Sequence, residues 1–143
     1  MNSLFRVSAR NHAGLILMAE LARPASHVPR PASGEVAFVS LKDVAERMGL
    51  SQGFLEEIAT DLKKSKLIEG RKGPGGGYRL AKPANKITAE EILSALEGPV
   101  QMISCTCGPC PKEKGCSSKS LWSFLHRDIA KSLKSTTLAE IVK

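Results

Sequence analysis

The sequence predicts a mainly α-helical chain with a small β-wing, in which a winged helix-turn-helix is followed by a long C-terminal helix. Two short helical segments meet at a glycine, the arrangement typical of a helix-turn-helix. A glycine-rich stretch then separates two short segments of strand character. Apolar residues recur every four positions near the C-terminus, as in a helix with one apolar face. A length of 143 residues is enough to bury a hydrophobic core.

The N-terminal segment begins with a predicted helix over residues 8–22. Ser8 is a suitable N-cap because its hydroxyl can accept a hydrogen bond from the first turn, and apolar residues recur at helical spacing after it. Prolines, serines and a glycine fill residues 24–35, which predicts a loop. Residues 36–39 are expected to form a short strand.

The helix-turn-helix is expected to follow this strand. A first helix is predicted over residues 41–48 and ends at Gly49. Its inward side chains are expected to be Val44 and Met48. A second helix over residues 51–64 carries a longer apolar stripe, made of Phe54, Leu55, Ile58 and Leu62.

A β-hairpin is predicted directly after this second helix. Residues 67–68 and 78–80 have strand character, and the glycine-rich turn between them carries Arg71 and Lys72. A hairpin in this position is the wing of a winged helix.

Three further helices are predicted toward the C-terminus. Residues 88–91 form a capping box that opens a helix ending near Leu96. A long helix is expected over residues 118–134, followed by a short one over residues 137–140. The apolar stripe of the long helix consists of Leu121, Leu125, Ile129 and Leu133, with Trp122 beside it.

We divide the chain into a winged helix-turn-helix domain, residues 1–82, and a C-terminal part, residues 83–143. The second part contains a cysteine loop, residues 104–117, and the long helix. An apolar stripe needs a surface to cover it, so the long helix is interpreted as a dimerisation helix. Packing within the same chain is the alternative.

The charge is concentrated in one stretch. The chain has 21 basic and 14 acidic residues, and residues 63–82 carry a net charge of +6. The basic residues of this stretch are Lys63, Lys64, Lys66, Arg71, Lys72, Arg79 and Lys82, and its one acid is Glu69. Such a concentration favours a polyanionic partner over a merely solvated basic face.

The second helix of the helix-turn-helix and the wing are the predicted DNA contacts. Burial of the apolar stripe leaves the polar side of this helix facing outward. On that side a glutamine can hydrogen-bond the edge of adenine, and a glutamate can accept a hydrogen bond from the amino group of cytosine. Its serine cap and free backbone N–H groups suit a phosphate. Glu56 would select bases, or it is simply an exposed acid. The candidate DNA-binding residues are Ser51, Gln52, Gly53, Glu56, Lys63, Arg71 and Lys72.

All four cysteines lie within twelve residues, at Cys105, Cys107, Cys110 and Cys116. A disulfide framework would scatter them, and no export signal is evident, so a reducing cytoplasmic location is expected. One compact loop without a second Cys-x-x-Cys knuckle favours an iron–sulfur cluster. A structural zinc site and thiol redox chemistry remain the alternatives.

Taken together, these features resemble the IscR/NsrR-type family of winged-helix, iron–sulfur-binding transcription regulators. The resemblance covers nearly the full length, and the wing and the cysteine loop together are its specific part. It is carried by Ser8 with Ala13, residues 51–55, the wing 71–78, the cysteine loop, Leu121-Trp122 and residues 137–141.

The resemblance implies a homodimer that binds an approximately palindromic operator in double-stranded DNA. It also implies that a 2Fe-2S or 4Fe-4S cluster reports iron supply, redox state or nitric oxide. We expect Cys105, Cys107, Cys110 and Cys116 to hold this cluster, with Cys107 replacing the fourth ligand of the family pattern, which this chain lacks. His12 of the partner subunit, or Asn11, is the alternative fourth ligand.

Other function classes lack support in the sequence. No paired acid and base or activated nucleophile is evident, so the chain is not expected to be an enzyme. The glycine-rich stretch lacks the Lys–Ser/Thr ending of a nucleotide-triphosphate loop and lies between strands. Cys107-x-x-Cys110 would suit a thiol-redox protein, but no thioredoxin-like strand and helix flank it. The longest apolar run is too short for a membrane span.

Overall fold

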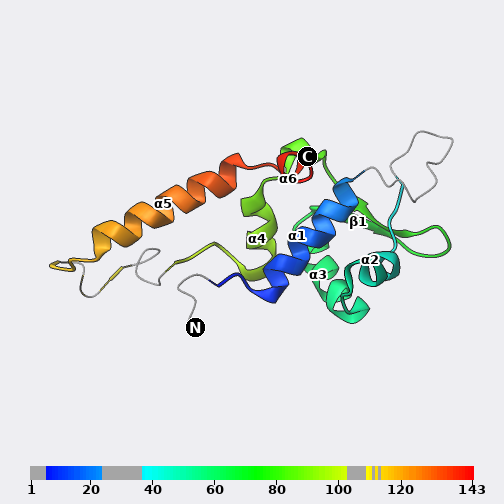
Figure 1. Ribbon diagram of the computed structural model, residues 1–143, viewed down its shortest axis with the longest axis horizontal. Coiled ribbons are helices and arrows are strands. Elements are labelled where there is room, and N and C mark those ends of the chain that lie inside the picture. The colour runs from blue at the N-terminus through cyan, green and yellow to red at the C-terminus, as the bar shows by residue number, and fades with distance from the viewer. Residues whose placement is uncertain (1–5, 24–36, 103–108, 111, 113) are drawn as a thin grey trace.

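The computed structural model describes residues 6–23, 37–102, 109–110, 112 and 114–143 (Figure 1). A body of short helices and one hairpin forms one end of the molecule, and a long helix projects from it. The elements are α1 (Ala9–Ala22), α2 (Leu41–Met48), α3 (Gln52–Lys64), β1 (Ile68–Arg71), β2 (Gly77–Leu80), the 3-10 helix η1 (Ala84–Lys86), α4 (Ala89–Glu97), α5 (Lys119–Ser135) and α6 (Leu138–Ile141). The predicted fold class, mainly α with a winged helix-turn-helix and a long C-terminal helix, is confirmed.

Local capping explains where most helices begin. The Ser8 hydroxyl accepts a hydrogen bond from the backbone N–H of Asn11, at 3.0 Å, and so caps α1. Both α4 and α6 open with a complete capping box, in which a threonine and a glutamate satisfy each other's backbone N–H groups. The two pairs are Thr88 with Glu91 and Thr137 with Glu140.

The turn of the helix-turn-helix depends on Gly49. Its backbone has φ 65° and ψ 33°, the left-handed conformation that glycine adopts without a steric penalty. Its N–H donates to the carbonyl of Ala45 and so ends α2. Two residues later Ser51 caps α3 by accepting from the N–H of Phe54, at 3.4 Å. The predicted boundaries of both helices are confirmed.

The C-terminal end of α3 is closed by a Schellman arrangement. The N–H of Lys66 donates to the carbonyl of Lys63 and the N–H of Leu67 to that of Leu62, both at 3.0 Å. Lys66 occupies the left-handed position, with φ 58°. This cap turns the chain directly into β1, so the position of the wing follows from the end of the helix.

The wing is an antiparallel pair in which Ile68 lies opposite Leu80 and Arg71 opposite Gly77. The predicted hairpin is confirmed, although the first strand starts one residue later and runs longer than expected. Val39 joins the hairpin through two backbone hydrogen bonds of 2.8 Å to Tyr78. The strand predicted over residues 36–39 is therefore reduced to a bridge at Val39, and Val36 lies outside the described residues.

The close approach at this bridge requires a glycine in β2. A Cβ added to Gly77 would lie 2.3 Å from the carbonyl oxygen of Val39. The residue also has φ 138°, a conformation that L side chains rarely adopt. Any larger residue at this position would push the wing away from the segment before α2.

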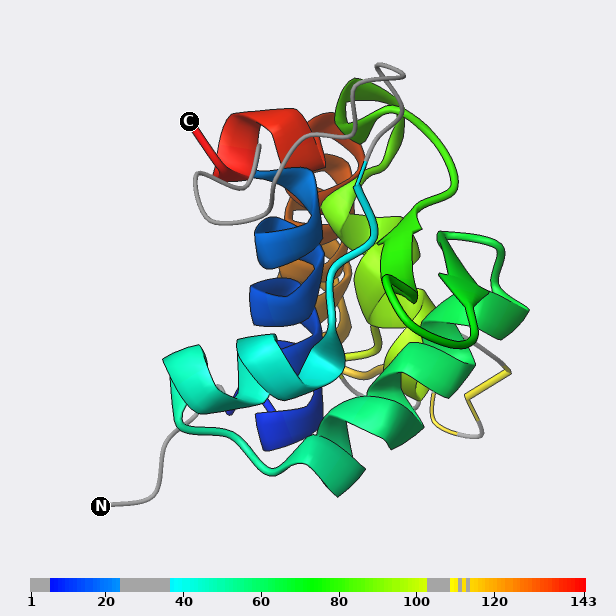
Figure 2. The same cartoon turned by 90° about the vertical axis from the view of Figure 1, so that its right-hand side faces the viewer.

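The hydrophobic core joins α1, α3, α4 and the C-terminal α6. Its completely buried side chains include Leu17 and Met18 of α1, Leu55 and Ile58 of α3 and Leu138 of α6. Figure 2 shows α1 and α4 side by side behind the helix-turn-helix. Side chains from both sides of residue 82 thus share one core; whether the two predicted parts behave as separate domains stays a prediction.

Two side chains differ from their predicted orientation. Met48, expected inward, is 40% exposed, because α2 buries Leu41, Val44 and Ala45 and the chain leaves the helix immediately after Met48. Phe54, expected in the buried stripe, is only partly buried at the first turn of α3. The small side chain of Ala59 is buried in the inner face instead.

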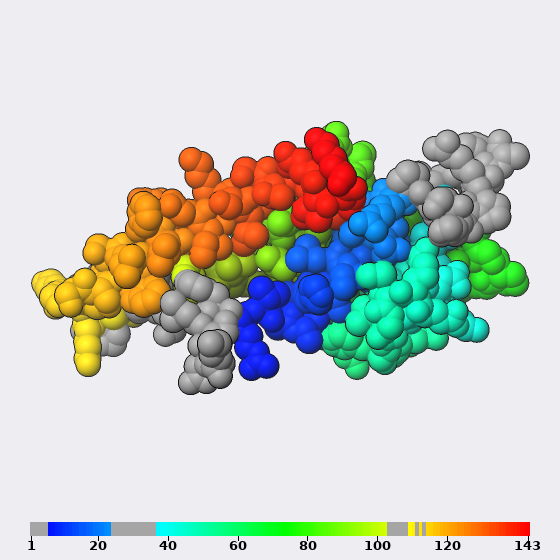
Figure 3. Space-filling view, viewed as in Figure 1, coloured from blue at the N-terminus to red at the C-terminus, as the bar shows by residue number. Residues whose placement is uncertain are grey.

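The long helix α5 projects beyond the body of the molecule (Figures 1 and 3). None of its residues is fully buried within the chain. Leu121 of the predicted stripe is 53% exposed and the neighbouring Phe124 is 51% exposed. At its C-terminal end, Lys134 lies 3.8 Å from Glu90 of α4, which ties this end to the body.

Leu138 of α6 provides the test of the shared core. Replacing it with alanine should lower the free energy of unfolding by about 2–5 kcal/mol, because a completely buried side chain is removed. Ile141→Ala, in the same short helix but 39% exposed, is the matched control and should cost much less. Chemical denaturation of both variants would measure this. Equal small losses would show that α6 does not belong to the core.

Candidate nucleic-acid interface and cysteine loop

The outer face of α3 presents polar side chains to solvent. Its inner face buries Leu55, Ile58, Ala59 and Leu62 against the core. The structure places all five predicted contact residues of this segment outward: Ser51, Gln52, Gly53, Glu56 and Lys63 are exposed. The burial of one side of the helix therefore selects the side that can meet a ligand.

Two of the predicted base-reading residues contact each other. The side-chain Nε2 of Gln52 donates to Oε1 of Glu56 at 3.1 Å, one helical turn apart. The hydroxyl of Thr60 donates to the backbone carbonyl of Glu56 at 2.8 Å. Gln52 and Glu56 thus form one polar unit on the outer face.

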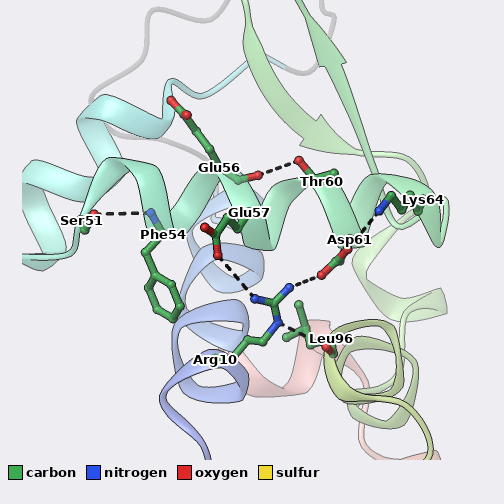
Figure 4. A network of polar contacts seen from close by, with 9 residues as sticks. All are labelled: Arg10, Ser51, Phe54, Glu56, Glu57, Thr60, Asp61, Lys64 and Leu96. Carbon is green, nitrogen blue, oxygen red and sulfur yellow. Dashed lines mark hydrogen bonds and ion pairs between the residues drawn. The ribbon is translucent and has the colours of Figure 1, made fainter.

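Arg10 of α1 connects α3 to α4 (Figure 4). Its guanidinium donates to Oδ2 of Asp61 and lies 3.8 Å from Oε2 of Glu57, both on α3. Its Nε donates to the backbone carbonyl of Leu96, near the end of α4, at 3.3 Å. The sequence did not single out Arg10, because its partners lie 51 and 86 positions away and no local pattern marks such a contact.

The wing carries the two other predicted contacts. Arg71 and Lys72 are exposed, and Nη2 of Arg71 donates to the carbonyl of Gly75 at 3.1 Å across the turn. The guanidinium of Arg71 also lies over the ring of Phe38, 4.6 Å from its centroid. Phe38 was not among the predicted site residues.

Ion pairs sort the cations of the basic stretch into two groups. Three have an acidic partner: Lys64 with Asp61 at 3.5 Å, Arg79 with Glu69 at 3.1 Å, and Lys82 with Glu91 at 2.8 Å. The hydrogen bond from Lys82, together with those from Thr88, lowers the pKa of Glu91 and keeps it ionised. The remaining four, Lys63, Lys66, Arg71 and Lys72, have no acidic partner among the described residues. Three of these four are predicted DNA contacts.

The cysteine loop is described only in part. Cys110 and Cys116 are free thiols and half-buried, whereas Cys105 and Cys107 lie outside the described residues. Within the described part of the chain, no group of three or more His, Cys, Asp or Glu side chains is arranged to hold a metal ion. The predicted four-cysteine site therefore stays a prediction.

Cys116 lies at the start of α5, next to Ser118. Its sulfur is 3.5 Å from the Ser118 hydroxyl, and this side-chain hydrogen bond is the main reason that the pKa of the Cys116 thiol is lowered. Backbone N–H groups of the first turn act in the same direction. A lowered pKa favours the thiolate, the form that binds metals and reacts with electrophiles.

The alternative fourth ligands lie on α1. The side-chain nitrogen of Asn11 donates to Oε2 of Glu97 at 2.7 Å. The side-chain oxygen of Asn11, Oδ1, is buried without a hydrogen-bond partner. The next residue, His12, is exposed. Asn11 therefore lies next to the end of α4, from which the chain enters the cysteine loop.

No helix in the described part of the chain is both long and apolar enough to cross a membrane.

Comparison with known proteins identifies the relatives of this chain. Residues 31–143 match the family model Rrf2, described as iron-dependent transcriptional regulator. The HTH-type transcriptional regulator IscR of Klebsiella pneumoniae (strain 342) is 35% identical over 111 residues, which cover 77% of this chain and 68% of that protein.

Solved structures give the same result. The global cysteine regulator CymR of B. subtilis matches with a TM-score of 0.78 and 27% identity, covering 96% of both chains. The IscR of T. potens matches with a TM-score of 0.74 and 30% identity, covering 96% of this chain and 86% of that one.

The Cys116–Ser118 contact predicts a measurable change in thiol reactivity. In metal-free, reduced protein, Ser118→Ala should raise the pKa of Cys116 toward its ordinary value, because the main stabilising hydrogen bond of the thiolate is lost. The midpoint of the pH dependence of Cys116 alkylation, followed by mass spectrometry, should therefore move to higher pH. Ser117→Ala is the matched control and should leave the midpoint in place. Coincident profiles for wild type and Ser118→Ala would contradict the assignment.

Proposed function

The chain belongs to the Rrf2 family of transcriptional regulators, and from this membership we propose a sequence-specific DNA-binding regulator that works as a cytoplasmic homodimer. Its relatives are named regulators, and the chain is not an enzyme. The observation that carries the proposal is the coincidence of an exposed polar face on α3 with unpaired cations in the adjoining wing.

In the proposed complex, the N-terminal half of α3 enters the major groove of duplex DNA. Gln52, Gly53 and Glu56 face the base edges, and the Ser51 cap contacts a phosphate at the start of the helix. Glu56 accepts from cytosine and disfavours bases that offer only acceptors. Lys63 contacts the backbone, while Arg71 and Lys72 reach the adjacent minor groove.

The long helix α5 supports the proposed homodimer. Leu121 and Phe124 are more than half exposed within the described part of the chain, and no residue of α5 is fully buried there. A second copy would cover them and place two α3 helices on an approximately palindromic operator. The two copies would use the same apolar surface, as expected for a symmetric pair.

The proposed sensor is an iron–sulfur cluster, 2Fe-2S or 4Fe-4S, held by Cys105, Cys107, Cys110 and Cys116. The two described thiols fit a cluster chemically, since neither is in a disulfide and the pKa of Cys116 is lowered. When bound, a cluster supplies a group whose integrity depends on iron, oxidants and nitric oxide. His12 or Asn11 of the partner subunit is the proposed alternative fourth ligand.

The chain's own contacts support a connection between the loop and α3. The chain runs from the end of α4, at Glu97, into the loop, and Arg10 joins the last turn of α4 to Asp61 and Glu57 of α3. Asn11 holds Glu97 at the same end of α4. We propose that the state of the loop reaches α3 through this end of α4.

A second candidate replaces the cluster with a structural zinc ion or a thiol-redox switch, with DNA binding retained. The contact with Ser118 and the lowered pKa of Cys116 favour the thiol-redox switch. A lower pKa raises the fraction of Cys116 that is present as thiolate, the form that oxidants attack. Metal analysis separates the two candidates.

The salt dependence of DNA binding tests the assignment of the cations. Lys72→Ala should lower the slope of log K against log salt by about one unit, because one cation that releases counterions from the DNA is lost. Lys82→Ala is the matched control, since its ammonium is already paired with Glu91 at 2.8 Å, and it should change the slope much less. Equal slopes for Lys72→Ala and wild type would remove Lys72 from the interface.

Anaerobic purification tests the sensor. The wild-type protein should be coloured and contain iron and acid-labile sulfide, and Cys110→Ser and Cys116→Ser should each lose both. His126→Ala, which alters a histidine of α5 that is not a proposed ligand, should retain them. Colourless wild-type protein that contains zinc, or no metal, would contradict the cluster. Identical DNA affinity with and without the cluster would contradict its role as a switch.

A further inference from the structure

Phe38 lies against the wing, where it contacts two arginines at once. The guanidinium carbon of Arg71 is 4.6 Å from the centroid of its ring and that of Arg79 is 4.7 Å. Both distances fall within the range of a cation–π interaction. The next residue, Val39, is fixed to Tyr78 by two backbone hydrogen bonds of 2.8 Å, so the ring is attached to the wing itself.

The register of the hairpin explains why one ring meets two cations. Arg71 lies opposite Gly77 and Glu69 opposite Arg79, so Arg71 and Arg79 are diagonal neighbours on one face of the hairpin. Two guanidinium groups at this spacing repel each other. The electron-rich face of an aromatic ring offsets this repulsion without neutralising either charge.

The two arginines differ in their other partners. Arg79 forms a salt bridge with Glu69, with its two nitrogens at 3.1 and 3.3 Å from Oε2. Arg71 donates to the neutral carbonyl of Gly75 and has no acidic partner among the described residues. Arg71 is therefore ordered by neutral contacts and keeps its full charge for an external anion.

We propose that Phe38 is a positioning residue for DNA binding: its ring holds the guanidinium of Arg71 in the orientation in which it meets the duplex. A long side chain that is ordered before binding loses less conformational entropy when the complex forms. This inference rests on the proposed function and adds to it a residue that lies outside both α3 and the hairpin.

The test compares Phe38→Leu with Phe38→Trp, because leucine keeps apolar volume and tryptophan keeps the aromatic face. The probe is a duplex selected by the wild-type protein from a random-sequence library. Phe38→Leu should weaken binding about fivefold, the size expected for loss of one exposed cation–π contact, and Phe38→Trp should restore it. In an Arg71→Ala background, Phe38→Leu should have no further effect.

A second readout does not need DNA. The Nε–Hε proton of Arg71 should be shifted upfield in the NMR spectrum by the ring current of Phe38, and Phe38→Leu should abolish this shift while the protein remains folded. A wild-type shift that persists in Phe38→Leu would overturn the contact itself.

The outcomes separate this proposal from the proposed function. If the wild-type protein binds no duplex, both fail. If Arg71→Ala weakens binding but Phe38→Leu does not, only the role of Phe38 is overturned. Equal weakening of DNA binding by Phe38→Leu and Phe38→Trp would show that Phe38 has a merely structural role. The same conclusion would follow if Phe38→Leu weakened binding as much in the Arg71→Ala background as in the wild type. Either result would overturn the proposed role of Phe38.

Discussion

The position of α3 is the constraint on which the functional surface depends. Its inner face is completely buried at Leu55, Ile58 and Leu62, so the helix cannot rotate about its axis without exposing the core. Arg10 adds a polar restraint, since its guanidinium joins two carboxylates of α3 to the backbone of α4. A surface helix held on both its apolar and its polar flank can present a fixed set of side chains to a groove.

Ion pairing gives the surface charge a pattern that the net charge does not show. The basic stretch carries seven cations, but acids of the same chain hold Lys64, Arg79 and Lys82. Exposed pairs of this kind contribute little to stability. Within the basic stretch, the cations without an acidic partner among the described residues are then Lys63 and Lys66 near the end of α3 and Arg71 and Lys72 in the wing.

Local signals in the sequence were sufficient to predict the helices and the hairpin. Contacts between residues far apart in the sequence were not predicted. Gly49, Ser51 and the capping boxes each act within about four residues, so the helix boundaries were correct. The inward orientation of Met48 was wrong, because its burial depends on what lies beyond the end of α2. Arg10 and Phe38 were missed for the same reason, since nothing near them in sequence indicates partners 51 or 33 positions away. The outward residues of α3 were predicted correctly because they follow from the stripe on the same helix.

The path of the chain connects the cysteine loop to two elements of the fold, α4 before it and α5 after it. The loop leaves the end of α4 that Arg10 and Asn11 hold, and it ends at the start of α5. The other end of α5 is fixed to the body, since the carbonyl of Thr136 accepts from Ala89 at 2.9 Å and the N–H of Leu138 donates to the carbonyl of Ile87 at 2.8 Å. The long helix is therefore tied at its C-terminal end and connected to the loop at its N-terminal end. In the chain, residues 98–118 run from the last turn of α4 to the start of α5, and Arg10 bonds that last turn to α3.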